Sequence, residues 1–508
     1  MDDLLNEYME LSNDTTTSVS PDSQQQQQCT NNTREQAEYD DYITRTKEYY
    51  HKMSCRDFFR ALWFSASSLH ICAAEYVKYK IGWKSRNHAI IDVSKRLAAK
   101  NMMYVKIFQA FATNRNIVSP ELNQFFSEYT DNVKYTEDEY DINELKELED
   151  RSCECDPDSR LRILHDYKPI KSGLMSLIFK GVITTHSGSD DDGSGSDTPI
   201  PVVVKYLRKN ISKTFNASMN NLVVFAKFTR YFPYLRTLNV ENLILQNIVC
   251  LNDQVCFRKE LANITLYYKS WSDYDYVKIP KPYADYTEKI NPDIIVMEYI
   301  DGMKITEIDP EDNDEFGKVL AAFNAKAAFC TSFYHGDLHP GNILFIKTPL
   351  GKYKIGILDF GIIGHLSRDD QELLFRAMKF MYQRKYNKIV DIIMSCELSE
   401  SANPENEVHT VVPSKDSIKY DTLRNELTEV IVRYTTPEIK FFGVSEIYEI
   451  NYILNNYGLM FKRSLYRLFI TVAIMDSIGT RLGSKMSYMQ HMTDIVVDMF
   501  NIDLDEAD

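Results

Sequence analysis

Two short polar motifs in the second half of this chain constrain its fold more than any other feature. They are His335-Gly-Asp-Leu-His-Pro-Gly-Asn342 and Leu358-Asp-Phe-Gly361. A short hairpin between them, with strands over 343–346 and 352–359, would bring both motifs to one place. Asp337 can then orient an accepting hydroxyl, while Asn342 and Asp359 hold Mg²⁺ against nucleotide phosphates. The spacing therefore predicts a site for phosphoryl transfer.

The segment upstream supplies the opposite half of such a site. Residues 179–185 and 201–207 alternate as paired strands do, and Lys205 follows a run of valines. A lysine at this place can bind the α- and β-phosphates of a nucleotide, provided that a helical carboxylate orients it. Glu260 lies in a helix-forming segment and is the best candidate for that carboxylate.

A buried strand over 294–300 is followed by a turn at Asp301-Gly302. This pattern predicts the hinge between two lobes. There the backbone between Glu298 and Ile300 can bind an adenine. Residues 97–112, far upstream, read as an amphipathic helix.

At this point residues 96–483 resemble a known family, the UbiB-type atypical kinases, also called the ADCK family, which are associated with coenzyme Q and other prenyl-lipid metabolism. Both motifs correspond, as do residues 257–263 and 296–302. The diagnostic part is Lys106-Ile-Phe-Gln109 with residues 119–131, which is similar to the family's Lys-x-Gly-Gln helix and its sequel. The resemblance implies an α+β, bilobal protein-kinase-like fold with an N-terminal helical extension and a helical C-lobe. It also implies ATP and Mg²⁺ as cofactors, and gating roles for Lys106 and Gln109.

Three positions depart from the family pattern. Phe108 stands where the family has glycine, and we expect it to pack against the N-lobe. The family's alanine-rich phosphate loop is replaced by residues 171–176, in which Ser172 and Gly173 are the candidates for nucleotide contacts. A family pair of carboxylates that faces the Lys-x-Gly-Gln helix is here Gln254 and Cys256.

Composition divides the chain unevenly. The net charge is −15, yet residues 1–41 carry ten acidic residues and one basic residue, and two further acidic runs lie at 136–156 and 187–197. The remainder is slightly basic, which suits a phosphate ligand but is too little for nucleic-acid binding. We predict these domains: a disordered tail (1–41), a helical extension (42–160), an N-lobe (161–300) with a flexible loop (187–197), a C-lobe (301–500) and an acidic tail (501–508).

The nine cysteines form no framework, so we expect reduced thiols. We also expect neither a signal or transit peptide nor a membrane span, and a location that is cytoplasmic or peripheral to a membrane. The helix around 58–77 is the candidate for attachment to a lipid or membrane surface. The sequence leaves the oligomeric state open.

The segment after Asp359 lacks the long phosphorylatable loop of protein kinases, because Ser367 and Asp370 already begin a helix. Further helices are expected at about 386–396, 418–434 and 459–482. We therefore predict Mg²⁺-dependent ATP binding, with phosphotransfer or ATP hydrolysis, on or in support of a small lipid-related substrate. Two alternatives remain: a small-molecule kinase of the aminoglycoside or choline type, and a nucleotide-binding pseudokinase scaffold.

Overall fold

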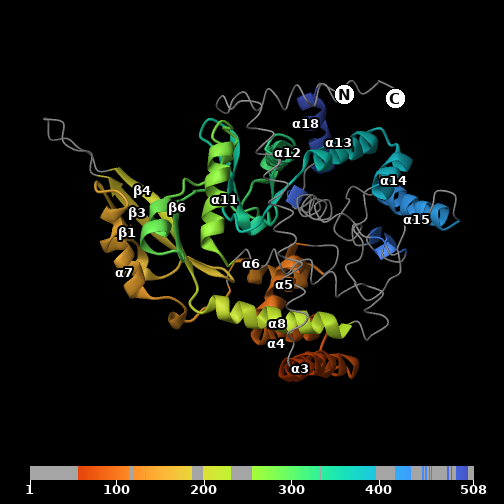
Figure 1. Ribbon diagram of the computed structural model, residues 1–508, viewed down its shortest axis with the longest axis horizontal. Coiled ribbons are helices and arrows are strands. Elements are labelled where there is room, and N and C mark those ends of the chain that lie inside the picture. Colours follow the sequence, from red (N-terminus) through yellow and green to blue (C-terminus); the bar gives the residue numbers. More distant parts are fainter. Residues whose placement is uncertain are drawn as a thin grey trace.

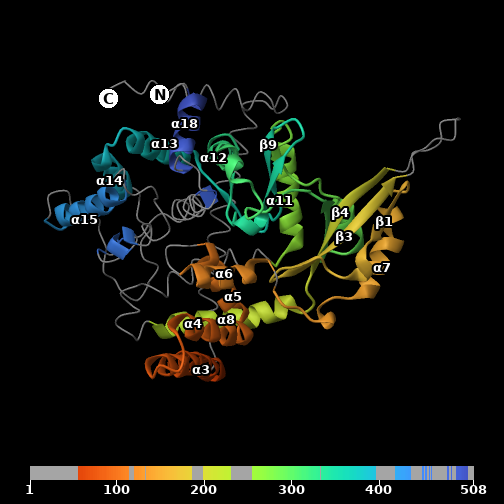
Figure 2. The ribbon, with the colours of Figure 1, turned by 180° about the vertical axis from the view of Figure 1, so that it is seen from behind.

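A computed structural model describes residues 55–113, 119–131, 133–185, 198–229, 255–331, 333–395, 418–435 and 488–500, with scattered positions between 449 and 482. The predicted tails at 1–41 and 501–508 and the loop at 187–197 lie outside these residues. Figures 1 and 2 show three groups of elements: a sheet with its covering helices, a lower layer of helices, and a larger helical part.

An antiparallel sheet forms the N-lobe. Its strands run in the order β1, β3, β4 and β6, and β2 pairs with β3. Their bounds are β1 Ser159–Ile163, β2 Lys171–Ser172, β3 Ser176–Thr185, β4 Thr198–Leu207 and β6 Ile294–Glu298. Because side chains alternate along β4, Val202 and Val204 are fully buried on one face, and Lys205 lies on the other. The predicted pairing of 179–185 with 201–207 is confirmed.

Two helices cover the faces of this sheet. α7 (Ile142–Asp150) places Leu145 and Leu148, both fully buried, in one cluster with Val202 and Val204. α11 (Phe257–Ser270) lies on the other side and carries Glu260. The sheet face that holds Lys205 therefore looks toward the helix that holds Glu260.

The N-terminal extension is a layer of helices below the two lobes in Figure 1. It contains α3 (Cys55–Lys80), α4 (Arg86–Lys100), α5 (Met102–Thr113) and α6 (Pro120–Asp131), and α8 (Ile211–Thr229) packs against α3 and α5. The single helix predicted over 97–112 is wrong. It breaks at Asn101, whose backbone is extended and whose side-chain oxygen accepts a hydrogen bond from the Met103 N–H at 2.7 Å. This local side-chain acceptor starts a new helix.

The C-lobe is mainly helical. Its helices are α12 (Asn313–Phe329), α13 (Arg368–Tyr382), α14 (Tyr386–Ser395), α15 (Ile418–Thr435) and α18 (Tyr488–Phe500). Its strands are β7 (Phe333–His335), β8 (Ile343–Lys347), β9 (Tyr353–Ile357) and β10 (Ile363–His365), and β5 (Val277–Lys278) pairs with β9. α12 is its central helix and packs against α18 and β9.

Several sequence predictions in the C-lobe are confirmed. The hairpin of β8 and β9 follows the first motif, and Ser367 and Asp370 cap α13 reciprocally through hydrogen bonds of 3.2 and 3.3 Å. The helices expected near 386–396 and 418–434 are α14 and α15, whereas most of 459–482 lies outside the described residues. The predicted α+β, two-lobed architecture is confirmed.

Candidate active site

A buried histidine ties the two motifs together. β7 and β10 pair antiparallel, which places His335 opposite Ile363. The Asp337 N–H donates to His335 Nδ1 at 3.2 Å, so Nε2 carries the ring proton and donates to the Asp359 carbonyl oxygen. Burial lowers the pKa of His335, which keeps the ring neutral near neutral pH. One ring therefore sets where Asp337 and Asp359 stand relative to each other.

Asn342 adds a second link between the motifs. Its Nδ2 donates to the Asp337 carbonyl oxygen at 3.0 Å, and the Leu358 N–H donates to the Asn342 carbonyl at 3.0 Å. Asn342 is buried, and Asp337 is half-buried. The hairpin thus returns Asp359 beside Asn342, as the motif spacing predicted.

Asp359 lies where the two lobes meet. Its Oδ1 accepts from the Gly361 N–H at 3.0 Å, and its Oδ2 accepts from Lys205 at 2.9 Å. The next residue, Phe360, is fully buried, and its carbonyl accepts from Asn263 of α11 at 2.8 Å. The side chain of Asp359 is still 35% exposed, so solvent or a ligand can reach it.

Lys205 connects the sheet, α11 and the second motif. Its Nζ lies 2.5 Å from Glu260 Oε1 and 2.9 Å from Asp359 Oδ2, and the side chains of Lys205 and Glu260 are 7% and 3% exposed. Burial favours the neutral amine, but the charges of Asp359 and Glu260 outweigh burial and raise the pKa of Lys205. Burial raises the pKa of Glu260, and the lysine only partly opposes it.

The same balance acts on Asp359. Burial would raise its pKa, but the charge of Lys205 and the Gly361 N–H lower it overall. At neutral pH Lys205 is therefore positively charged and Asp359 negatively charged, and the two form an ion pair.

The phosphate loop is held from inside the protein. Ser172 is buried and donates its hydroxyl to the Val133 carbonyl at 2.5 Å. Arg208 donates to Ser172 Oγ and to the Gly173 carbonyl, both at 2.6 Å, and also contacts Glu139. The Ser172 hydroxyl and the Gly173 N–H, which donates to the Ser176 carbonyl at 2.9 Å, are thus both used within the protein. The roles of Ser172 and Gly173 remain predictions.

Two further cations approach the catalytic loop. Lys171 of β2 donates to the Gly341 carbonyl at 3.1 Å, which joins the phosphate loop to the first motif. The positive charge of Lys106, on α5, also acts on the ring of His339. Burial lowers the pKa of His339, and the charges of Lys106 and Lys171 add to this effect. Lys106 and Gln109 both lie on α5, and their gating roles remain predictions.

Phe108 lies elsewhere than expected. It is buried, and its ring stacks on Phe126 at 5.3 Å and tilts against Tyr129 at 5.7 Å, both on α6. The expectation that it packs against the N-lobe is wrong. Met102, Met103 and Val105 of α5 instead belong to the main hydrophobic cluster, which includes residues of both lobes. Of the two departures upstream of Glu260, Gln254 lies outside the described residues, and Cys256 immediately precedes α11.

The hinge follows β6. The Glu298 N–H donates to the Lys281 carbonyl at 2.9 Å, and the Tyr299 N–H donates to the Pro201 carbonyl at 3.0 Å. The carboxylate of Glu298 lies 2.6 Å from Lys278. Ile300 is buried beside Gly356 of β9. The N–H groups of Glu298 and Tyr299 are thus used within the protein. Of the two predicted hinge residues, Ile300 is therefore the better candidate for a backbone contact with adenine.

The donors at the site fit Mg²⁺. Asn342 offers an amide oxygen and Asp359 a carboxylate. Mg²⁺ prefers oxygen ligands and takes one or two carboxylates, with phosphates and water. In the described ranges, no three His, Cys, Asp or Glu side chains gather as a metal cluster.

Sequence reasoning missed three residues that shape this site: His335, Lys171 and Arg208. His335 opens the first motif and was not assigned a role. Arg208 directly follows β4 and lies outside both motifs, so its sequence position carries no signal. Lys171 was seen only as a departure from the family loop.

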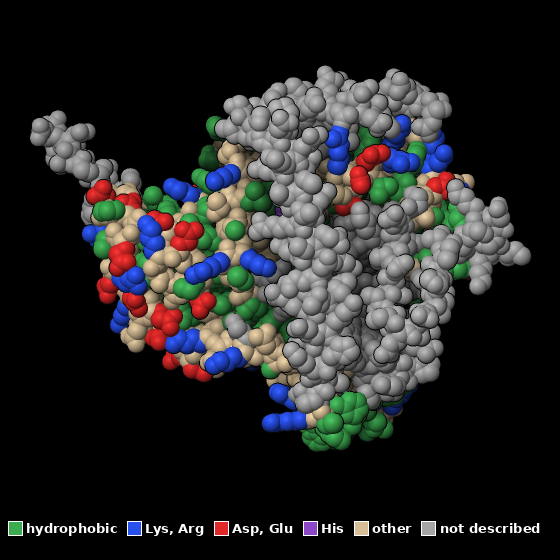
Figure 3. Space-filling view, viewed as in Figure 1, with side chains coloured by type: hydrophobic (Ala, Val, Ile, Leu, Met, Phe, Trp, Pro, Cys, Tyr) green, Lys and Arg blue, Asp and Glu red, His purple; other side chains and the backbone are tan. Residues whose placement is uncertain are grey.

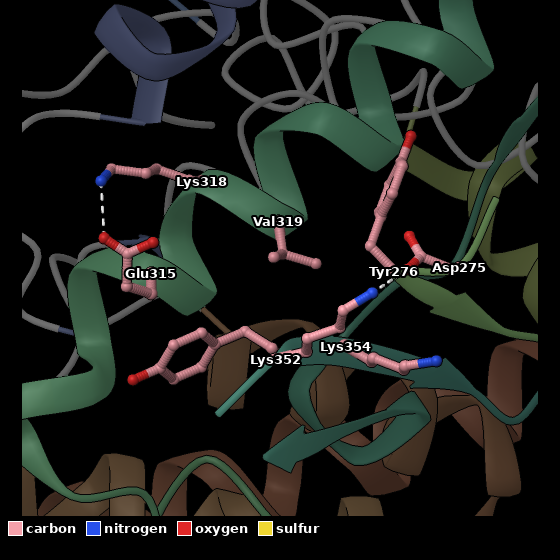
Figure 4. A pocket seen from close by; sticks show the side chains of 8 residues that line it. Asp275, Tyr276, Glu315, Lys318, Val319, Lys352 and Lys354 are labelled. Atoms are coloured by element: carbon pink, nitrogen blue, oxygen red, sulfur yellow. Dashed lines mark hydrogen bonds and ion pairs between the residues drawn. The ribbon is translucent and has the colours of Figure 1, made fainter. Parts of the chain in front are cut away.

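A separate cavity of about 320 Å³ lies between α12, β9 and the turn before β5 (Figure 4). Two ion pairs edge it, Lys318 with Glu315 at 2.6 Å and Lys352 with Asp275 at 2.9 Å. None of its lining residues belongs to the predicted site.

Comparison with known proteins adds to this geometry. Residues 185–393 match the family described as the ABC1 atypical kinase-like domain. The Arabidopsis thaliana protein ACTIVITY OF BC1 COMPLEX KINASE 8, chloroplastic, is 25% identical over 299 residues, which are 57% of this chain and 36% of that protein. Probable protein kinase UbiB from Photobacterium profundum is 29% identical over 198 residues, which are 38% of this chain and 36% of that protein.

The chain therefore spans 36% of the length of each of these two relatives. A solved complex of Rv3197 with erythromycin, from Mycobacterium tuberculosis, aligns with 79% of this chain and 98% of that chain, at 15% identity and a TM-score of 0.42. Across the described parts of the chain, every helix is too short or too polar to cross a membrane.

Proposed function

We propose that this chain, whose residues 185–393 match the ABC1 atypical kinase-like domain, binds ATP with Mg²⁺ and transfers its terminal phosphoryl group, either to a small acceptor or to water. The observation that carries the proposal is the contact of Lys205 with both Glu260 and Asp359. It joins the sheet, α11 and the second motif in the arrangement that phosphoryl transfer requires.

Each residue has a defined part in this mechanism. Lys205, held by Glu260, binds the α- and β-phosphates, and the hinge backbone near Glu298 and Ile300 binds the adenine. Asn342 and Asp359 would hold Mg²⁺, which neutralises the charge on the phosphates when it is bound. These residues position the nucleotide, and positioning with electrostatic stabilisation supplies most of the catalysis in this reaction class.

Asp337 acts on the acceptor. Its carboxylate accepts the proton of the attacking O–H while the new P–O bond forms and the bond to the departing ADP breaks. With a hydroxyl acceptor this is a kinase reaction, and with water it is ATP hydrolysis. Hydrogen bonds join the backbone of Asp337 to the side chains of His335 and Asn342. They fix the position of the loop, which supports the role of Asp337 as the proton acceptor.

The acceptor we propose is small and lipid-related. The chain passes from Gly361 through β10 directly into α13 at Arg368, so there is no long segment after Asp359 to bind a peptide. The names of the relatives include protein kinases, and a peptide acceptor is therefore one outcome that the assay must test.

Turnover by the purified chain tests the proposal. We expect Mg²⁺-dependent release of phosphate from ATP, and a loss of about 100-fold or more in Asp337→Asn, with ATP binding retained. Asp275→Asn is the matched control, because Asp275 is an exposed aspartate in the separate cavity. Equal turnover in Asp337→Asn and wild type would contradict the assignment.

The alternative of a nucleotide-binding scaffold has one specific observation in its favour. Ser172 and Lys171 are engaged with Val133 and Gly341, so the phosphate loop is held by protein groups. Mg²⁺-ATP binding without any turnover would favour this alternative. Turnover that appears only with hydroxylated small molecules would favour the small-molecule kinase instead.

A further inference from the structure

Lys171 lies on the same face of the N-lobe sheet as Lys205. Lys171 of β2 is directly opposite Ile178 of β3, and Ile178 is directly opposite Lys205 of β4. Residues directly opposite each other in an antiparallel pair project to the same face, so these three side chains form one row across three strands. Two strand spacings, about 9.5 Å, separate the backbones of the two lysines. Both lysines therefore project toward the candidate active site, where Lys205 contacts Glu260.

The side chain of Lys171 reaches from the N-lobe to the first motif. Its Nζ donates to the Gly341 carbonyl at 3.1 Å, and Gly341 directly precedes Asn342, one of the two proposed Mg²⁺ ligands. Lys205 contacts the other proposed ligand, Asp359, at 2.9 Å. One ammonium group thus contacts a proposed metal ligand, and the other contacts the neighbour of the second ligand. The space between the two lysines is the place at which the phosphates of a nucleotide would meet the metal.

The phosphate loop that begins at Lys171 already uses two of its donors within the protein. The Gly173 N–H donates to the Ser176 carbonyl at 2.9 Å, and the Ser172 hydroxyl donates to the Val133 carbonyl at 2.5 Å. Glycine-rich loops bind phosphates through backbone N–H groups, which this arrangement restricts. A lysine side chain can supply the missing donor as a point charge. Lys171 is also a departure from the alanine-rich loop of the family that the sequence resembles.

The carboxylates of the site create a need for a second cation. Lys205 is shared between Glu260 and Asp359, at 2.5 and 2.9 Å. Asp337 adds a further carboxylate on the first motif. One lysine does not balance these groups, and a bound polyphosphate brings more negative charge, so the like charges repel. A second cation on the same sheet face offsets this repulsion, and Lys171 is in the position to do so.

We propose that Lys171 is a second phosphate-binding residue of this site, so that the polyphosphate of the nucleotide lies between Lys171 and Lys205. The inference rests on the nucleotide binding proposed above. When the nucleotide enters, the ammonium group exchanges the neutral Gly341 carbonyl for a phosphate oxygen, and this exchange is favourable because both partners then carry charge. Lys171 therefore raises the affinity for ADP and ATP, and it leaves the affinity for adenosine unchanged.

Calorimetric titration of the full chain with adenosine, ADP and ATP, with and without Mg²⁺, tests this contact. Lys171→Met removes the charge and keeps the length of the side chain. We expect the affinity for ADP and ATP to fall by about tenfold or more, the size of one charge-assisted hydrogen bond, while adenosine binds as it does to wild type. The loss should appear with and without Mg²⁺, because the contact does not pass through the metal.

Lys168→Met is the matched control. Lys168 lies three residues before Lys171 and is exposed. Figure 3 shows basic and acidic side chains intermixed over the side of the molecule where Figure 1 places the sheet and α7, so the loss of one exposed charge there changes the local field little. The control variant should bind all three ligands as wild type does. Unchanged melting temperatures of both variants show that the fold is kept, and Lys171→Gln is a second neutral variant if Lys171→Met melts lower.

The possible failures of this proposal and of the proposed function are distinct. If wild type and Lys171→Met bind ATP with equal affinity, Lys171 is not a phosphate ligand, and the proposed function stands. If Lys171→Met binds adenosine and ATP more tightly than wild type does, Lys171 closes the site instead, and the inference is wrong. If wild type binds neither adenosine, ATP nor inorganic tripolyphosphate, the proposed function fails together with the inference.

Discussion

Removing Lys205 should destabilise the chain in a way that depends on pH. Lys205→Met leaves Glu260, whose side chain is 3% exposed, without its cation. Loss of one partner of a buried ion pair costs roughly 3–5 kcal/mol, because a charge is left uncompensated. Glu260→Gln should cost less, about 1–3 kcal/mol, since Lys205 keeps its contact with Asp359 at 2.9 Å.

The pH dependence has a definite sign. Burial already raises the pKa of Glu260 above its ordinary value, and removal of Lys205 takes away the main charge that opposes this rise. A carboxyl with a higher pKa in the folded than in the unfolded protein contributes stability at low pH that is lost as the pH rises. The deficit of Lys205→Met should therefore be small near about pH 5 and large near about pH 8. The double variant Lys205→Met/Glu260→Gln should recover part of the loss at the higher pH.

Urea unfolding, followed by tryptophan fluorescence at several pH values, measures the stability lost in each variant. Of the three tryptophans, Trp63 and Trp83 are exposed, so the signal reports mainly on buried Trp271, directly after α11. Lys318→Met is the control, because the side chains of Lys318 and Glu315 are 53% and 47% exposed and such pairs contribute only about 0–1 kcal/mol. If the two single losses simply add in the double variant, Lys205 and Glu260 do not act as one unit and the reasoning fails.

Three further predictions concern other parts of the chain. Asp359→Asn removes a full charge from the proposed Mg²⁺ site, so the apparent affinity for Mg²⁺-ATP should fall by about tenfold. The thermal shift caused by Mg²⁺-ATP measures this affinity, and an unchanged shift would refute the role. Phe108→Gly should increase hydrogen exchange across α5 and α6 more than Lys106→Ala does, because Phe108 stacks on Phe126 at 5.3 Å; the reverse order would mean that charge holds the extension. Hydrogen bonds from Lys78 and Lys84 lower the pKa of Glu75 from 4.5 to about 2. The stability that the charged Glu75 adds is therefore lost as the pH falls through this range. The difference in unfolding midpoint between wild type and Glu75→Gln should shrink over the same range.

The sequence predicts those site residues that lie close together along the chain. Asp337, Asn342 and Asp359 lie within one turn–hairpin–turn segment, so their spacing alone brings them together once β8 and β9 pair. Lys205 and Glu260 are further apart in the sequence, and strand periodicity, a helix-forming segment and the downstream motifs were needed to pair them. Their contact at 2.5 Å agrees with that pairing.

The remainder depends on which distant groups meet, and no pattern in the sequence encodes that choice. The ring of Phe108 could have packed on either side of α5, and only the assembled extension shows that Phe126 and Tyr129 receive it. The break at Asn101 was missed for another reason. Asparagine is tolerated in a helix but competes for backbone donors, and tertiary packing decides which outcome wins.

Arg208 shows how the extension and the phosphate loop are joined in this chain. The guanidinium donates to Ser172 and Gly173 in the loop, and to the Val133 carbonyl at 3.2 Å in the segment that follows α6. The Val133 N–H in turn donates to the Ser172 carbonyl at 2.9 Å. Because a buried arginine with several acceptors holds a fixed geometry, a shift of α6 would reach the phosphate loop through these bonds. The contact between the extension and the site thus passes through residues 133, 172 and 208.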